Sequence, residues 1–139
     1  MNKSTFFSGQ PVLAQLIKLI PDSLIGQLVV RHDADRYYKT FKSRDHLIAM
    51  LYACFHNCMS LREVITGLEA SYNKFVHLKL KSIPRRSTLS DANAGREVTF
   101  IEDLHQELCR RYYRSLPDRW KGKALESRLF IMDSITVTL

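Results

Sequence analysis

The chain has 139 residues, of which 45% are hydrophobic and 25% are charged, and its formal net charge is +7. This length and apolar content predict one globular domain with its own core, and the positive charge favours a polyanionic partner. Because no apolar run reaches the roughly 18 residues of a membrane span and no secretory leader is visible, we expect a cytoplasmic protein without a membrane partner.

The positive charge is concentrated in two segments. Residues 74–96 contain six Lys or Arg and one acid, and residues 110–128 contain seven Lys or Arg and two acids. The segment between them, residues 97–109, is acidic and contains no Lys or Arg. A polyanion is therefore expected to meet particular surfaces rather than the whole molecule.

Three helices are predicted in the first half of the chain. Apolar residues at helical spacing indicate one that ends at Pro21, and Asp22 is placed to cap the next. Ser43 is predicted to cap a third helix, residues 44–57. This third helix is apolar on more than one side and is therefore expected to lie inside the domain.

A polar loop, residues 32–40, separates the second and third predicted helices. Tyr37, Tyr38 and Phe41, in and just after this loop, are predicted to pack back against the core. The alternative is that these aromatic rings stack on nucleic-acid bases.

Two capping boxes and a β-rich segment mark further elements. Ser60 with Glu63 predicts the start of a fourth helix after a turn of only a few residues, and Thr99 with Glu102 predicts the start of another. The final segment, residues 128–139, is rich in β-branched side chains and is predicted to be a strand.

Between these two capping boxes, a short helix with a small polar outer surface is predicted after Pro84. Ser87 is a suitable N-cap, and Gly95 can end the helix in a left-handed conformation. Leu89 and Ala92 fall on one face, toward the core. The helix N-terminus carries free N–H groups and a partial positive charge, which suit a phosphate. The alternative is a solvated connecting helix preceded by a basic loop.

These elements together predict a mainly α fold, a compact bundle of about six helices with a C-terminal strand. The third and fourth helices and the short helix form a plausible helix-turn-helix-like unit. In such a unit a short helix enters the groove of DNA with its N-terminal residues nearest the bases. The long connection over residues 72–86 departs from a compact helix-turn-helix.

The three cysteines, Cys54, Cys58 and Cys109, are predicted to be buried reduced thiols. A zinc site at Cys54 and Cys58 is the alternative. It fails on ligand number, because no second pair of Cys or His at suitable spacing completes four ligands. We therefore predict no metal site in this chain.

Four segments resemble, in the same order, motifs from the N-terminal region of bacterial insertion-sequence transposases of the DDE superfamily. Residues 86–93 (RSTLSDAN) are similar to that family's RSTL-x-x-AN motif, and residues 35–41 (DRYYKTF) to its DRY…K-F segment. Residues 60–68 (SLREVITGL) are similar to its SLRDI…GL segment. Residues 132–136 (MDSIT) are similar to its LDSTTI strand, which carries the first catalytic aspartate.

The resemblance implies a ribonuclease-H-like catalytic domain in which three carboxylates hold two Mg²⁺ or Mn²⁺ ions. Asp133 matches the first carboxylate, and the other two are absent from this sequence. Asp133 is therefore expected to be vestigial, and the chain to be a truncated product that is inactive alone and holds no cofactor. Residues 1–125 would be the helical DNA-binding domain, and residues 126–139 the start of the first strand region of the catalytic domain.

The function implied is DNA binding, as the end-recognition domain of a transposase whose partner is duplex DNA at insertion-sequence ends. The residues predicted to contact the nucleic acid are Lys79, Lys81, Arg85, Arg86, Ser87, Thr88, Ser90, Asn93 and Arg96. The alternative is a protein-interaction module that pairs with full-length transposase, through the terminal strand or an apolar stripe formed by Leu13, Leu16 and Ile20. A third hypothesis is an enzyme completed by carboxylates from another chain. A homo-oligomer is also possible.

Overall fold

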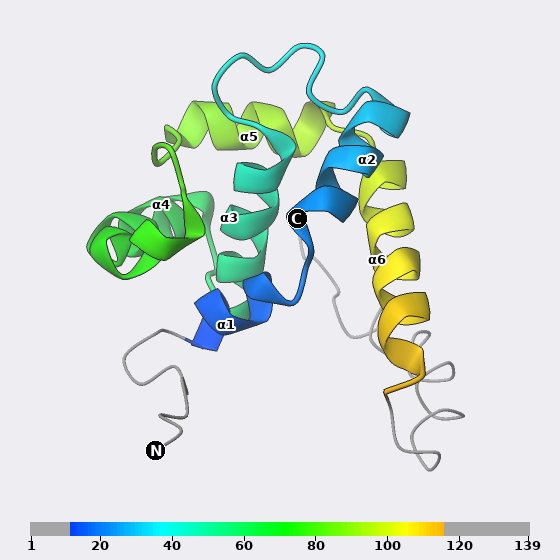
Figure 1. Cartoon of the computed structure of the whole chain (residues 1–139). Helices are drawn as coiled ribbons and strands as arrows, with labels where there is room; N and C mark the ends of the chain where they lie inside the picture. Colours follow the sequence, from blue (N-terminus) through cyan, green and yellow to red (C-terminus); the bar gives the residue numbers. More distant parts are fainter. Residues whose placement is uncertain (1–11, 116–139) are drawn as a thin grey trace, which may run out of the picture. The chain divides into compact units, whose positions relative to one another are not determined.

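The computed structural model describes residues 12–115, apart from the side chains of Val76 and His77. This region is built from helices, so the prediction of a mainly α fold is confirmed (Figure 1). The terminal strand predicted at residues 128–139 and the domain boundary predicted at residue 125 lie outside the described residues. The elements in chain order are α1 (Val12–Lys18), α2 (Asp22–His32), α3 (Ser43–Phe55), α4 (Leu61–Ala70), the 3-10 helix η1 (Tyr72–Leu78), α5 (Arg86–Gly95) and α6 (Val98–Tyr113).

The chain divides into two compact units, and the division falls within α6. The first unit runs to Leu104 and contains α1 to α5 and the first turns of α6. The second begins at His105, and the structure describes its residues up to 115. Among the described residues no single helix has the length and hydropathy of a membrane span; α1 and α2 meet that test only as a pair bent by 65°.

The core of the first unit surrounds α3, as its apolar character predicts. Both α1 and α4 pack against α3, α4 also contacts α5, and η1 packs against α1 and α4. The long connection before α5 therefore contributes to the core through Phe75 and Leu78 instead of forming a plain loop. The buried cluster includes Ile48, Ala49 and Tyr52 of α3, Val64 and Leu68 of α4, and Leu89 and Ala92 of α5.

The capping box predicted at the start of α4 is formed in part, with Ser60 as the N-cap. The Ser60 hydroxyl accepts the backbone N–H of Glu63 at 3.3 Å. The Glu63 carboxylate in turn accepts the backbone N–H of Met59 at 2.7 Å, one residue further back than in the usual box. The Glu63 N–H, an otherwise orphan donor of the first helical turn, is thereby satisfied, and the chain just before the helix is tied to Glu63.

The predicted cap of α3 is wrong, because Ser43 is the first residue of the helix and Lys42 is the N-cap. A carboxylate from the preceding loop satisfies this helix start. Asp35 Oδ1 accepts both the Ser43 N–H, at 2.7 Å, and the Ser43 hydroxyl, at 2.8 Å. The predicted cap of α2 at Asp22 is also one position too late in the chain, because α2 begins at Asp22 itself and its N-cap is Pro21.

Three further predicted helix boundaries are also wrong. The helices α5 and α6 begin at Arg86 and Val98, so Ser87 and Thr99 lie inside the first turn and not before it. Gly95 is the last residue of α5, and a C-cap with extended backbone follows it. Its missing side chain serves close packing instead, because a Cβ there would lie 2.8 Å from the Tyr38 hydroxyl.

The loop between α2 and α3 meets the packing prediction only in part. Phe41 is buried in the core and Tyr38 is half-buried against it. Tyr37 is 82% exposed, so the prediction that it packs on the core is wrong. The Arg36 guanidinium lies 5.4 Å from the centre of the Tyr37 ring.

Two glycine substitutions are expected to have opposite effects on the free energy of unfolding, and the first lies at the contact between α3 and α4. A Cβ at Gly67 would lie 2.8 Å from Cε1 of the Tyr52 ring, which is itself fixed by stacking on His56 and an edge contact with Phe75. Gly67→Ala is therefore expected to lower the free energy of unfolding by about 1–3 kcal/mol through overpacking.

Gly26 in α2 is the matched control, because no atom lies within 4 Å of a Cβ at that position. Gly26→Ala is expected to raise the free energy of unfolding by up to about 1 kcal/mol, since alanine has the higher helix propensity. Urea denaturation of the two variants measures both effects. A stabilised Gly67→Ala protein would contradict the close approach of Tyr52.

Candidate nucleic-acid interface

A run of basic residues leads from η1 into α5. Lys79, Lys81, Arg85 and Arg86 are all exposed, and Arg85 and Arg86 are the N-cap and first residue of α5. We call these four residues the basic surface. Their positions agree with the predicted placement of positive charge at the start of the short helix, where the helix dipole adds to it.

Ion pairing distinguishes the basic surface from half of the ten arginines of the described region, although Arg62, Arg111 and Arg114 also form no ion pair there. Five arginines of the described region have carboxylate partners: Arg31 with Asp103, Arg36 with Asp33, Arg44 with Asp22, Arg96 with Asp35, and Arg110 with Glu107. Within residues 12–115, the side chains of Lys79, Arg85 and Arg86 form no ion pair or hydrogen bond. Their charges are therefore not neutralised within the described part of the protein.

Helix α5 presents a slim polar face to solvent. Leu89 and Ala92 are completely buried, as predicted, whereas Ser87, Ser90 and Asn93 are exposed. Thr88 is half-buried. A helix face made of such small side chains can approach another surface closely.

Asn93 is held in place by a histidine of α3. His46 Nε2 lies 2.6 Å from Asn93 Oδ1. Burial lowers the pKa of His46, the nearby Arg96 lowers it further, and the hydrogen bond with Asn93 opposes both. With Nε2–H as the donor, a neutral His46 fixes the Asn93 carbonyl and leaves the amide NH₂ group to face outward.

Arg96 is not part of the exposed interface, contrary to the sequence prediction. Its side chain is only 8% exposed and forms an ion pair with Asp35 at 3.7 Å. The guanidinium donates to the backbone carbonyls of Phe41 and Lys42 and lies 4.1 Å from the centre of the Tyr38 ring. A guanidinium engaged in this way fastens the loop before α3 to the end of α5 and cannot reach a phosphate.

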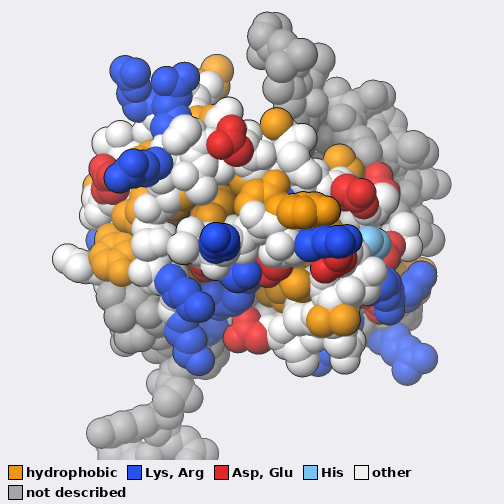
Figure 2. Space-filling view, turned by 90° about the horizontal axis from the view of Figure 1, so that it is seen from above, with side chains coloured by type: hydrophobic (Ala, Val, Ile, Leu, Met, Phe, Trp, Pro, Cys, Tyr) orange, Lys and Arg blue, Asp and Glu red, His pale blue; other side chains and the backbone are white. Residues whose placement is uncertain are grey.

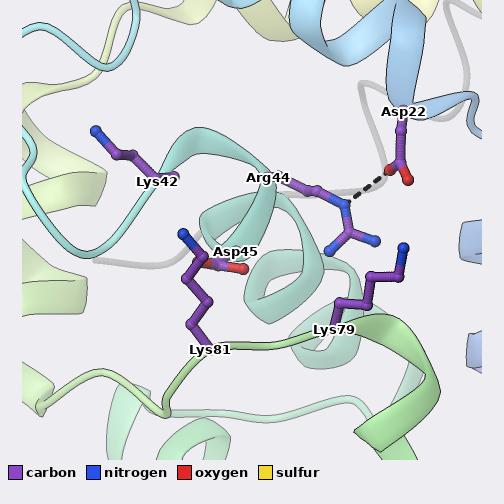
Figure 3. Close-up of a pocket in the computed structure, with 6 residues that line it drawn as sticks. All are labelled: Asp22, Lys42, Arg44, Asp45, Lys79 and Lys81. Carbon is purple, nitrogen blue, oxygen red and sulfur yellow. Dashed lines mark hydrogen bonds and ion pairs between the residues drawn. The ribbon is translucent and has the colours of Figure 1, made fainter.

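Lys79 and Lys81 line a pocket that the sequence did not predict. The cavity has a volume of about 300 Å³, and Lys42, Arg44 and Asp45 from the start of α3, together with Asp22 of α2, complete its wall (Figure 3). We call these six residues the basic pocket. Nothing in the local sequence pattern indicates it, because it is formed by three separate segments, and Asp22 lies 20 positions before Lys42 while Lys79 lies 34 positions after Asp45.

Arg44 joins the segments that form the basic pocket. Its Nη1 donates to the Leu78 carbonyl at 2.7 Å, and its Nε donates to Asp22 Oδ1 at 2.9 Å. Burial raises the pKa of the neighbouring Asp45 carboxyl, and the charges of Arg44 and Lys81 counteract that rise.

The cysteines are not buried as predicted. Cys54 and Cys109 are exposed and Cys58 is half-buried, and all three are free thiols. Burial, and to a lesser degree Glu63, raises the pKa of the Cys58 thiol. No group of three or more His, Cys, Asp or Glu between residues 12 and 115 is arranged to hold a metal ion. Asp133, the predicted vestigial carboxylate, lies outside the described residues.

The described region is thus a helical domain with an unneutralised basic surface and a basic pocket. The chain belongs to a family described as a domain of unknown function, DUF4372, whose model matches residues 8–81. That match includes Lys79 and Lys81 and ends before α5. No curated protein and no solved structure matches the chain.

Proposed function

We propose that the chain binds duplex DNA through its basic surface and the exposed face of α5, as the end-recognition domain of an insertion-sequence transposase. The observation that carries the proposal is the set of unpaired cations Lys79, Arg85 and Arg86 beside an exposed helix N-terminus. Phosphate oxygens are the partners that such cations and free N–H groups favour. The likeness of residues 86–93 to a transposase motif supports the same reading.

The charge distribution favours a local contact over a wholly basic face. Seen from the side on which α5 and the loop before α3 lie, Lys and Arg side chains alternate with apolar and acidic ones (Figure 2). An arginine that is paired with a carboxylate, as Arg36 is with Asp33, carries little free charge. The proposed contact therefore centres on the start of α5, where Ser87, Ser90 and Asn93 follow the arginines.

The alternative hypothesis, a protein-interaction module, depends on two features, and the first of them, the predicted exposed apolar stripe, is not formed by the described residues. Leu13 is buried in the core, and Leu16 and Ile20 are half-buried, so they do not form an exposed stripe. Its other support, the terminal strand, lies outside the described residues. DNA binding is therefore the better supported proposal, with a homo-oligomer or full-length transposase as further partners.

The proposal assigns no catalysis to this chain. The complete family enzyme uses three carboxylates and Mg²⁺ or Mn²⁺ ions, and only Asp133 matches that set here. Metal-dependent DNA cleavage by the purified chain, abolished by Asp133→Asn, would show that this part of the proposal is wrong.

Replacing Arg85 and Arg86 together with alanine tests the DNA contact. Each lost phosphate contact is expected to reduce the magnitude of the negative slope of log K against log salt concentration by about 0.9. For the two arginines together, this corresponds to roughly 10- to 100-fold weaker binding at 0.1 M salt. Fluorescence anisotropy with a 20-base-pair duplex of random sequence, at several salt concentrations, measures both quantities.

The control is Arg31→Ala with Arg36→Ala, which removes the same net charge from two arginines that already have carboxylate partners. This variant should retain most of the affinity and a salt slope close to that of the parent. Equal losses in the two double variants would mean that only net charge matters, and would contradict a contact at the start of α5.

A further inference from the structure

We propose that the basic pocket is a site for a phosphate group, distinct from the contact at Arg85 and Arg86. The proposal adds Arg44 to the ligand-binding residues. Binding of a DNA backbone phosphate in the pocket rests on the proposed function, whereas the existence of a phosphate site does not. Four cations line the pocket against two carboxylates.

The two carboxylates leave part of the positive charge of the pocket uncompensated. Asp22 is already paired with Arg44, at 2.9 Å. Asp45 supplies the second negative charge, so four cations and two carboxylates give the six residues a formal charge of +2. Lys79 forms no ion pair or hydrogen bond with any residue between 12 and 115. An anion in the pocket would relieve the mutual repulsion of these cations.

The cations are also positioned before any ligand arrives. Arg44 is held by Asp22 and by the Leu78 carbonyl. Lys42 contributes positive charge only, because its Nζ donates to the Tyr38 carbonyl at 2.6 Å and points away from the other cations in Figure 3. In Figure 3 the Lys79 ammonium points toward the Arg44 guanidinium, and the Lys81 side chain extends toward Asp45. A guanidinium fixed in this way and flanked by lysines matches the geometry by which proteins hold phosphate.

The backbone at Lys79 is consistent with a binding role. Its φ of 54° lies in the left-handed region, which costs a residue with a side chain about 1–2 kcal/mol. Strain of this kind is retained where the surrounding structure requires it, often at ligand sites. The volume of about 300 Å³ lies at the small end of ligand pockets and is sufficient for a phosphate group with part of the molecule that carries it.

The basic pocket lies close enough to α5 for one duplex to reach both. Lys81 and Arg85 are four positions apart in the sequence, so their Cα atoms are at most about 14 Å apart. Duplex DNA carries one phosphate per roughly 1.7 Å of its axis. Several backbone phosphates therefore fall within that span. The same chemistry would also accept the phosphate of a free small molecule such as a nucleotide.

The test uses Lys79→Ala with Lys81→Ala, because neither side chain forms a hydrogen bond or an ion pair within 4 Å among the described residues. Titration calorimetry with inorganic pyrophosphate is the first measurement. We expect the parent and the Arg85→Ala, Arg86→Ala variant to bind pyrophosphate, and the double lysine variant to bind at least tenfold more weakly. Undiminished pyrophosphate binding by the double lysine variant, or no binding by the parent, would overturn the proposal.

A second variant tests the pocket without removing a cation. Asp45→Asn keeps the shape of the side chain and removes a negative charge among groups that include Arg44, Lys81, Asp35 and Arg96. It is expected to strengthen pyrophosphate binding at pH 7 several-fold. Weaker binding by a variant whose circular dichroism and urea midpoint match those of the parent would count against the pocket.

Duplex DNA separates the two sources of phosphate. Displacement of pyrophosphate by duplex would show that a backbone phosphate occupies the pocket, whereas simultaneous binding would assign the pocket to a free phosphorylated molecule. If pyrophosphate binding depends on the lysines but no duplex binds, the proposed DNA function fails and the phosphate site stands. If duplex binding depends on Arg85 and Arg86 but the double lysine variant retains full affinity for pyrophosphate, the pocket inference alone fails.

Discussion

Arg96→Ala is expected to lower the free energy of unfolding by about 3 kcal/mol. Breaking a buried ion pair costs about 3–5 kcal/mol because one charge is left uncompensated. We expect the lower value of this energy range because Asp35 would keep its two hydrogen bonds from Ser43. The lost contacts include the carbonyls of Phe41 and Lys42 and the face of Tyr38.

Arg85→Ala is the control for this prediction, since it makes the same substitution at an exposed arginine without a partner among the described residues. Its effect on the free energy of unfolding should stay within about 0.5 kcal/mol. A double-mutant cycle with Asp35→Asn should give a coupling energy of about 0.5–3 kcal/mol. Urea denaturation of the set measures all of these values, and equal effects of Arg96→Ala and Arg85→Ala would refute the structural role of Arg96.

Leu89→Ala is expected to lower the free energy of unfolding by about 2–5 kcal/mol. Leu89 is completely buried and anchors α5 in the core. Truncating it removes apolar contacts and leaves a cavity that close packing does not readily fill. The substitution is also expected to disturb the candidate interface, because Leu89 anchors the helix whose other face carries Ser87, Ser90 and Asn93.

Ser90→Ala is the matched control on the exposed face of the same helix. It should change the free energy of unfolding by no more than about 0.5 kcal/mol. Thermal and urea unfolding of both variants supply the comparison. A loss below about 1 kcal/mol for Leu89→Ala would mean that α5 is not seated in the core as described.

The Arg96 cluster also changes the interpretation of residues 35–41. Asp35 caps α3, Arg36 pairs with Asp33, and Phe41 offers its carbonyl to Arg96. Most of this segment therefore organises the start of α3 and the end of α5. Only Tyr37 remains as an exposed aromatic side chain in it.

Local chemistry alone determined much of the fold. The mainly α class, the central place of α3, the Ser60 capping box and the burial of Leu89 and Ala92 were all predictable. Each depends on side chains three or four positions apart, which meet on the same side of a helix whatever the rest of the chain does. The predicted exposure of positive charge just before α5 has the same local origin.

The tertiary structure alone decided which charged groups remain free for a ligand. Arg96 and Arg85 look alike in the sequence. Arg96 is bonded to Asp35 and to two loop carbonyls, whereas Arg85 has no partner among the described residues. Lys42 and Arg44 join Lys79 only because Arg44 reaches the Leu78 carbonyl across the fold. Ion pairing and desolvation depend on neighbours brought together by folding, and spacing along the chain does not encode those neighbours.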